Sequence, residues 1–163
     1  MIKDSGERRR FASGAVRDMG ENGKKGRCDL LPLSTIAELL NDSTFDNIEA
    51  FQRYGDTDYL ELVILNFSIS VFGDRNTAML EVAKHYEEGA LKYSERNWER
   101  GIPTHCYIDS AVRHYLKFRR GDKDERHDRA FLWNLMCCIW TCDNRPECND
   151  YPLIDDSKKS DKQ

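Results

Sequence analysis

Hydrophobic and polar residues recur with helical periodicity over most of the chain between residues 31 and 141. The pattern predicts helices over about 34–40, 76–93, 103–121 and 124–141, with a further helical segment over about 44–72 that is broken near residues 54–56. The later part of that segment, YLELVILNFSISVF, is so apolar and β-branched that a strand is the alternative. Short turns between the elements favour an all-α fold, a compact helical bundle of about five helices.

Residues with clear positional preferences mark the expected helix ends. Ser34 is expected to cap the first helix, and Asp122 or Asp124 to cap the last one. Pro103 is expected to start the fourth helix and Gly121 to end it.

The two ends of the chain lack this periodicity. Residues 1–30 are rich in Gly, Arg, Lys and Asp, and we expect an extended basic arm that is disordered or packs on a neighbouring subunit. Residues 142–163 are expected to form a polar, disordered tail, most clearly from about residue 155. The helical domain that would carry any catalytic site is therefore placed at residues 31–141.

Composition narrows the classes of partner. The net charge of −4 does not favour binding to nucleic acid or to an anionic membrane. No apolar run reaches the roughly 18 residues of a membrane span, and the start of the chain lacks the apolar core of a secretory signal. We therefore expect a cytoplasmic protein. The six cysteines lack Cys-x-x-Cys spacing and predict buried reduced thiols rather than a zinc site.

Acidic residues fall at the margins of two apolar helix faces. Glu87 lies at the edge of one stripe and Asp109 on the border of the next, with His114 on the opposite border, whereas Glu88 points more outward. Carboxylates at the margin of a bundle core can hold Mg²⁺, which prefers oxygen ligands.

The alternative for these acids is a surface laced with ion pairs. Glu88 with Lys92 and Asp109 with Arg113 both have the i,i+4 spacing of helical salt bridges. Periodicity alone does not separate the two interpretations.

Two polar residues lie in the last helix, which is apolar on nearly all sides. Asn134 must find hydrogen bonds there, either within the core or from a bound substrate. His127, on the same face, either pairs with Asp124 or contacts a substrate. In the polar connector KYSERNWERGIPTH, Trp98 either stacks on a base or plugs the core beneath the loop.

Several strings of the sequence resemble one enzyme family. They are SGERRRFASGAVRD, GRCDLLP, YEEGALKYSERNWERGIP, IDSAVRHYLKF and residues 127–135. Over about residues 5–141 the chain resembles the bacteriophage dATP/dGTP diphosphohydrolases, which are distantly related to the MazG-like all-α nucleotide pyrophosphatases. The resemblance implies hydrolysis of dGTP and dATP to the monophosphate and pyrophosphate with Mg²⁺ or Mn²⁺. It also implies a homo-oligomer (dimer or tetramer) in the host cytoplasm that supplies dGMP to phages with 2-aminoadenine in their DNA.

The resemblance also suggests residue roles. The MazG pattern of EExxE, a spacer and ExxD is met by Glu87, Glu88 and Asp109, which become the expected metal ligands, with Glu88 also the general base. Leu91 and Cys106 depart from the pattern, so a further ligand is expected from elsewhere, and the spare acids nearby are Glu95, Glu99, Asp124 and Glu125. The expected substrate-binding residues are Asp29, Lys92, Arg96, Asn97, Trp98, Arg113, His127 and Asn134.

Two rival functions stay open. An HD-type triphosphohydrolase would use the dipeptide His127-Asp128, although these residues flank opposite sides of Phe131 on a helix. A non-enzymatic, partner-binding phage protein would instead have its acidic edge at Glu87 and Asp109 closed by Lys or Arg.

Overall fold

The computed structural model describes residue 2, residues 4–19 and residues 25–153. Within these ranges lie six α-helices: α1 (Leu33–Leu40), α2 (Thr44–Tyr54), α3 (Asp58–Phe72), α4 (Arg75–Lys92), α5 (Thr104–Arg120) and α6 (His127–Asn144). Short 3₁₀ turns are η2 (Cys28–Leu30), η3 (Asn97–Arg100) and η4 (Pro146–Cys148), and strand β1 (Arg8–Arg10) pairs antiparallel with β2 (Val16–Asp18). The expected all-α fold is confirmed.

The break between α2 and α3 accounts for one helix more than expected. Gly55 ends α2 with φ of 72°, in the left-handed region that favours glycine. A Cβ at this position would lie 2.9 Å from Pro152 Cδ. The strand alternative for the next segment is wrong, because the residues that α3 buries recur every three or four positions: Leu60, Val63, Ile64 and Phe67.

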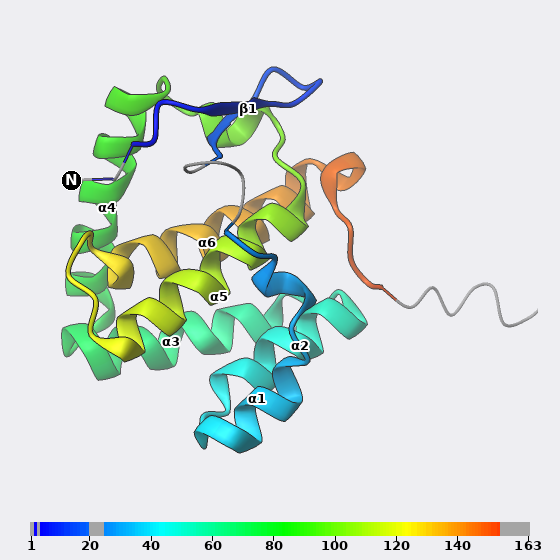
Figure 1. Cartoon of the computed structure of the whole chain (residues 1–163), viewed down its shortest axis with the longest axis vertical. Coiled ribbons are helices and arrows are strands. Elements are labelled where there is room, and N and C mark those ends of the chain that lie inside the picture. The colour runs from blue at the N-terminus through cyan, green and yellow to red at the C-terminus, as the bar shows by residue number, and fades with distance from the viewer. Residues whose placement is uncertain (1, 3, 20–24, 154–163) are drawn as a thin grey trace, which may run out of the picture.

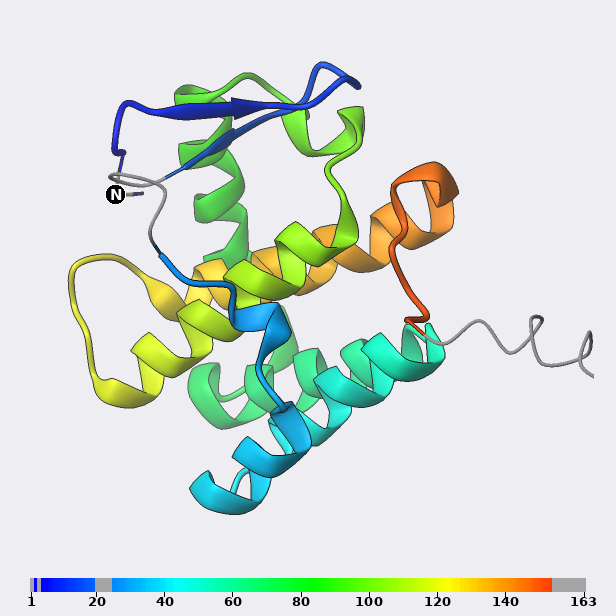
Figure 2. The same cartoon turned by 45° about the vertical axis from the view of Figure 1, so that its right-hand side comes forward.

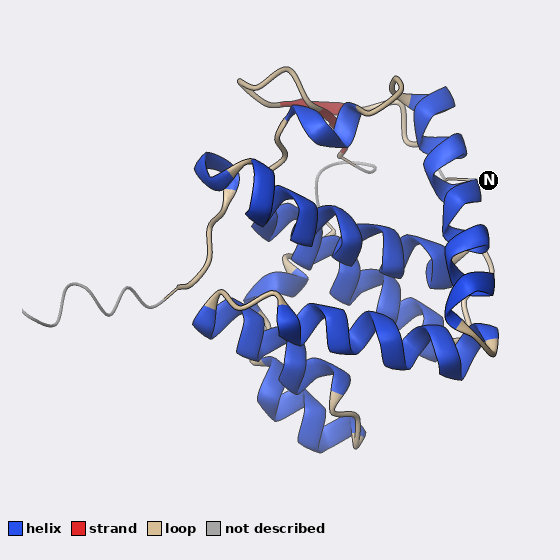
Figure 3. Cartoon of the chain, turned by 180° about the vertical axis from the view of Figure 1, so that it is seen from behind, coloured by secondary structure: helices blue, strands red, loops and turns tan. Residues whose placement is uncertain are grey.

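The core lies around the antiparallel pair α5 and α6, which run side by side through the middle of the molecule (Figure 1; Figure 2). Helices α1 to α3 pack on one side of this pair and α4 rises along its flank, as the view from behind also shows (Figure 3). Phe131 of α6 is fully buried, with its ring 4.9 Å from that of Phe67 and 4.7 Å from that of Tyr115.

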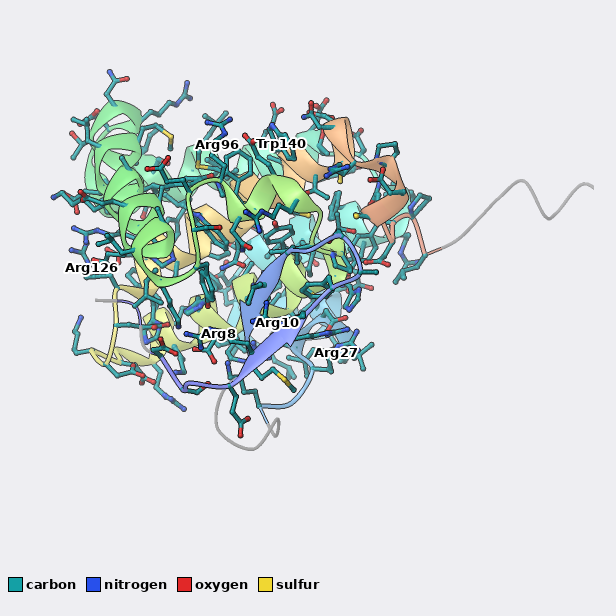
Figure 4. All side chains as sticks on the ribbon, turned by 90° about the horizontal axis from the view of Figure 1, so that it is seen from above. Arg8, Arg10, Arg27, Arg96, Arg126 and Trp140 are labelled. Atoms are coloured by element: carbon teal, nitrogen blue, oxygen red, sulfur yellow. The ribbon has the colours of Figure 1, made fainter. Side chains whose placement is uncertain are left out.

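The β1–β2 hairpin corrects the expectation of an unstructured arm for residues 8–18. It lies over the connection between α4 and α5, with Arg8 and Arg10 on β1 (Figure 4). The side chain of Asn97 holds it there: Val16 N–H donates to Asn97 Oδ1 (2.9 Å), and Asn97 Nδ2 donates to Val16 O (2.8 Å). Residues 20–24 of the expected arm lie outside the described residues.

Two expected helix caps are wrong. Helix α1 begins at Leu33 with Pro32 as its N-cap, so Ser34 lies inside the first turn. Helix α6 begins at His127 with Arg126 as its N-cap. Asp124 is too early in the chain to cap α6, and its carboxylate instead accepts a hydrogen bond from His127 Nε2 (2.7 Å).

The C-terminal segment packs further than expected. Helix α6 continues to Asn144, and Tyr151 is buried with its ring 5.1 Å from that of Phe51. Leu153 N–H donates to Gln52 O (3.0 Å), which ties the segment to α2. Of the expected polar tail, residues 154–163 lie outside the described residues.

Two further expectations concern the cysteines, which were expected to be reduced thiols, and the lack of a membrane span. All six cysteines are free thiols, and Cys106, Cys137 and Cys138 are buried, as expected. In the described part of the chain no helix combines the length and the apolar character that crossing a membrane requires.

Candidate active site

A cavity of about 780 Å³ opens between α4, α5, the start of α6 and the hairpin. We call it the α4–α5 cavity. Its size suits a ligand of small-molecule dimensions. Strand β2 contributes part of its wall through Val16, Arg17 and Asp18. Its lining includes six cationic residues, Arg17, Lys25, Lys92, Arg96, Arg113 and Lys117, and five acidic ones, Asp4, Asp18, Glu87, Glu95 and Glu125.

Arg17 has one nitrogen that is paired and one that is buried without a partner among the described residues. Its Nη2 donates to Asn134 Oδ1 (2.7 Å), and its guanidinium carbon lies 5.2 Å from the centre of the Tyr107 ring. Its Nη1 is buried and has no hydrogen-bond partner among the described residues. Because a buried donor without a partner is costly, Nη1 is available to an anion bound in the cavity.

Asn134 is the buried amide for which the sequence predicted hydrogen bonds either within the core or from a bound substrate. Its Nδ2 donates to Ala130 O (2.8 Å) and its Oδ1 accepts from Arg17. Asn134 also lines the cavity. The structure therefore places it as the support of an arginine at the cavity wall, and direct contact with a substrate stays a prediction.

Lys92 and Arg113 line the cavity as expected but are already engaged. Lys92 Nζ lies 2.7 Å from Asp18 Oδ2, and its side chain is 7% exposed. Arg113 Nη2 donates to Asp109 Oδ1 (2.6 Å) and to Gly26 O (2.8 Å), whereas its buried Nε has no hydrogen-bond partner among the described residues.

Aromatic rings form another side of the cavity. Tyr86, Tyr93, Trp98 and Trp133 all line it. The Trp98 ring packs edge-on against Trp140, with ring centres 4.9 Å apart, and near Tyr86 at 5.7 Å. Trp98 packs against core aromatic rings, as the plug interpretation requires, while base stacking on it stays a prediction.

A second feature of the cavity is a cluster that joins α5 to the start of α6. We call His114, Glu125 and His127 the His–Glu cluster. His114 Nδ1 lies 2.9 Å from His127 Nδ1 and 3.2 Å from Glu125 Oε1, which is 3.5 Å from His127 Nδ1. His114 and Glu125 line the cavity, and His127 lies behind them with 1% of its side chain exposed.

Burial lowers the pKa of two imidazoles at the cavity, His114 and His85. It is the main cause that lowers the pKa of His114 well below its ordinary value, and the neighbouring His127 and His85 add to the effect. Burial also lowers the pKa of His85 to about 4, with Arg129 as the next cause. Neutral imidazoles can accept hydrogen bonds or bind metal ions.

The three expected metal ligands are not gathered in the described residues. The groups of three potential ligand atoms lying within 4.8 Å of one another are His114, Glu125 and His127, and Asp122, Asp124 and His127. Asp109 Oδ1 accepts hydrogen bonds from Arg113 and from Cys28 N–H (2.7 Å) instead. This is the i,i+4 pair that the sequence left open. Glu87 is exposed and lines the cavity, whereas Glu88 is half-buried and is not among the lining residues, so the expectation that Glu88 points more outward than Glu87 is wrong.

The remaining expected residues have structural partners. Asn97 holds the hairpin, and Arg96 is largely exposed and paired with Glu99. The Asp29 carboxylate accepts from Arg27 Nε (2.7 Å) and is not among the described residues lining the cavity. These placements leave their roles toward a substrate as predictions.

The HD-type dipeptide does not act as one unit. Asp128 pairs with Arg126 (2.7 Å), whereas His127 faces His114 and Asp124. No three-ligand group in the described ranges contains Asp128. The two side chains therefore point to different partners, as their positions on the helix predicted.

Comparison with known proteins gives the family of the chain. A family model described as dATP/dGTP diphosphohydrolase, N-terminal, matches residues 69–151, about half of the chain. The chain belongs to this family. Comparisons with curated proteins and with solved structures found no match.

The dATP/dGTP diphosphohydrolase family model covers α4, α5 and α6, and with them the helical walls of the cavity and the His–Glu cluster. The hairpin that supplies Arg17 precedes the matched range. Membership implies a hydrolase that acts on nucleoside triphosphates, so the substrate is a nucleotide.

The sequence indicated part of this site and missed part of it. Arg17 was hidden in an arm without periodicity. His114 was visible at the border of an apolar stripe, but only the fold brings it to His127. The available signal was the shared helix face of His127 and Asn134, both of which prove to lie beside the cavity.

Proposed function

We propose that the α4–α5 cavity binds a purine deoxynucleoside triphosphate, dGTP or dATP, and hydrolyses it to the monophosphate and pyrophosphate. The observation that carries the proposal is the buried Nη1 of Arg17, which has no partner among the described residues, in a cavity lined by six cationic residues, in a chain of the dATP/dGTP diphosphohydrolase family. A triphosphate carries the negative charge that such a wall attracts.

Phosphate binding falls mainly to cavity cations that keep a donor to spare, although Arg113 also pairs with Asp109 and Lys117 with Asp124. Arg17 offers Nη1 and Arg113 offers Nε, both buried without a partner among the described residues. Lys117 and Lys25 lie on the same cavity. Lys92 is held by Asp18 (2.7 Å) and is better placed to fix the hairpin than to bind phosphate directly.

The base would lie against the aromatic side of the cavity. Tyr93 and Trp133 present rings there, with Trp98 behind the connector. Stacking on such rings favours the larger purines over pyrimidines.

In the proposed reaction the oxygen of a water forms a bond to the α-phosphorus. The bond from that phosphorus to the bridging oxygen breaks, and the electron pair leaves with pyrophosphate. The proton of the water passes to a carboxylate, for which Glu88 is the candidate from the resemblance and Glu87 the one that lines the cavity. Arg17 and Arg113 would hold the phosphate oxygens in place.

We propose Mg²⁺ or Mn²⁺ as the cofactor. When bound, such a cation lowers the pKa of a water and offsets charge on the phosphate oxygens. Glu87, Glu88 and Asp109 stay the ligands that the resemblance proposes, but Asp109 is already held by Arg113. The His–Glu cluster offers two nitrogens and one oxygen, a donor set that fits Mn²⁺ better than Mg²⁺.

The test is a product analysis. The purified full-length chain is incubated with each of the four dNTPs in Mg²⁺ or Mn²⁺, and the products are separated by ion exchange. Monophosphate and pyrophosphate from dGTP and dATP support the proposal. Tripolyphosphate and nucleoside would favour the HD-type rival, and no turnover of any nucleotide would favour the partner-binding rival.

On the resemblance alone, we also propose a phage role and an assembly. The reaction would supply dGMP for DNA that contains 2-aminoadenine, and would take place in the cytoplasm of the host. The chain would form a dimer or tetramer, which light scattering after gel filtration measures directly.

A further inference from the structure

We propose that the His–Glu cluster is a binding site for a divalent first-row transition metal ion, with His114 Nδ1, His127 Nδ1 and Glu125 Oε1 as its ligands. The ligand positions are set by three distances, 2.9, 3.2 and 3.5 Å, between these atoms. Binding of the ion stands on this geometry, and only its role in hydrolysis rests on the proposed function.

The three distances match the edges of a metal coordination polyhedron. Two ligands bonded at about 2.1 Å lie about 3.0 Å apart in octahedral geometry and about 3.4 Å apart in tetrahedral geometry. The three distances between the ligand atoms of the cluster, 2.9, 3.2 and 3.5 Å, cover the same range. One ion placed over this triangle would therefore reach all three atoms without a change in the backbone.

Hydrogen bonding orients His127 toward an ion. Its Nε2–H donates to the carboxylate of Asp124 (2.7 Å), which as an anion can only accept. With a single ring proton on Nε2, His127 turns the lone pair of Nδ1 toward His114. A carboxylate that fixes a ligand histidine in this way is the usual outer partner in metal sites.

Among the three facing atoms, one hydrogen is shared between two acceptors. A single hydrogen on His114 Nδ1 can point at His127 Nδ1 or at Glu125 Oε1. The lone pair of His127 Nδ1 and the charged Glu125 Oε1, 3.5 Å apart, would then face each other. A divalent cation is attracted to all three atoms at once.

The donor set selects the class of metal. Imidazole nitrogens suit Fe²⁺, Co²⁺ and Zn²⁺, and Mn²⁺ accepts them with lower affinity, whereas Mg²⁺ strongly prefers oxygen. Three protein ligands leave coordination positions for water or substrate oxygens. Because His114 and Glu125 line the cavity, these positions would face the nucleotide.

The neighbouring acidic group is a weaker candidate. Asp122 and Asp124 lie within 4.8 Å of His127, but Asp122 accepts from Arg120 Nε (2.7 Å) and Asp124 pairs with Lys117 (3.4 Å). Their charges are already compensated by Arg120 and Lys117. Asp124 therefore positions His127 rather than binding the ion.

The test measures metal binding without substrate. Full-length protein stripped with a chelator is titrated with Mn²⁺ in excess Mg²⁺, and free Mn²⁺ is followed by electron paramagnetic resonance. We expect about one Mn²⁺ per chain, and visible absorption bands when Co²⁺ is added. His114→Ala should weaken Mn²⁺ binding at least tenfold, and Asp124→Asn about 10- to 100-fold.

Two further variants keep the result interpretable. Glu125→Gln preserves the side-chain shape and removes the charge, so its loss of Mn²⁺ affinity with an unchanged circular dichroism spectrum cannot come from unfolding. His105→Ala is the matched control, because His105 also pairs with a carboxylate, Asp150 (2.7 Å), but outside the cluster. It should bind Mn²⁺ like the natural chain.

Each outcome separates the two proposals. Mn²⁺ binding that survives both His114→Ala and Glu125→Gln, or that is no tighter than Mg²⁺ binding, overturns the metal site. Metal binding that depends on the cluster in a chain that hydrolyses no dNTP leaves the site in place and refutes the proposed function. Turnover that persists with Mg²⁺ when Mn²⁺ binding is lost refutes only the role of the ion in hydrolysis.

Discussion

Replacing Arg17 by methionine tests the phosphate-binding role of the hairpin. Methionine keeps an apolar stem over the Tyr107 ring but removes the charge and both Nη groups. A hydrogen bond to a charged group contributes about 1.5–3 kcal/mol, so loss of the Nη1 contact to a phosphate should lower kcat/KM about 10- to 150-fold. The assay is steady-state release of pyrophosphate from dGTP.

For the same substitution we also predict the change in the free energy of unfolding. It removes the hydrogen bond from Arg17 to Asn134 (2.7 Å), which destabilises the fold. It also removes the buried Nη1, a donor without a partner among the described residues, and such a donor costs about 1–3 kcal/mol. These changes oppose each other, so the free energy of unfolding should stay within about 1 kcal/mol of the natural value. Activity should therefore fall far more than stability.

Arg9 offers the matched control. It lies directly across from Arg17 in the β1–β2 register, but it is exposed and is not among the residues lining the cavity. Arg9→Met should leave kcat/KM unchanged. A decrease of less than about threefold in Arg17→Met, or an equal decrease in Arg9→Met, would refute the role given to Arg17.

Three further predictions concern stability. Asn97→Ala removes two hydrogen bonds to Val16, so it should destabilise the hairpin by about 1–3 kcal/mol. The measurement is hydrogen exchange of the Val16 amide, which should become faster. Unchanged exchange would contradict the role of Asn97 in holding the hairpin. Burial lowers the pKa of His85 from 6.5 to about 4, so the folded state binds fewer protons than the unfolded state between these values. The free energy of unfolding of the metal-free chain should therefore fall by up to about 3 kcal/mol as pH drops from 6.5 to 4, and His85→Phe should flatten this slope in urea titrations. Phe131→Ala should cost about 3–5 kcal/mol in the same titrations, because the ring is fully buried against Phe67; a cost below 1 kcal/mol would contradict the packing.

The helices were predictable from the sequence because their apolar spacing is local information. Even where α3 resembled a strand, Leu60, Ile64 and Phe67 already had helical spacing. The hairpin was not predictable in this way. Its strands have three residues each, they are rich in arginine, and the side chain that holds them, Asn97, is 81 residues from Val16.

The site residues also divide into those that local spacing predicted and those that only the fold brings together. Lys92, Arg113 and Asn134 were expected near a substrate, and all three line the cavity. Helical spacing put Asp109 at the core margin, but spacing cannot tell a metal ligand from a partner of Arg113 one turn away. The pairing of His114 with His127 depends on how α5 and α6 cross, which no local pattern encodes.

The walls of the cavity differ in local stability, because one of them is the β1–β2 hairpin and the others are helices. An isolated two-stranded ribbon is only marginally stable in water, and this one reaches the main core, within the described residues, through the hydrophobic side chains of Ala15 and Phe11 alone, whereas α5 and α6 supply many core residues. The wall that carries Arg17 therefore opens at a lower free energy than the helices behind it. A nucleotide that contacts Arg17 must bind the closed fraction of molecules, so its apparent affinity includes the cost of closing the hairpin. Entry and release of ligand can thus be set by a short peptide ribbon while the helical core stays folded.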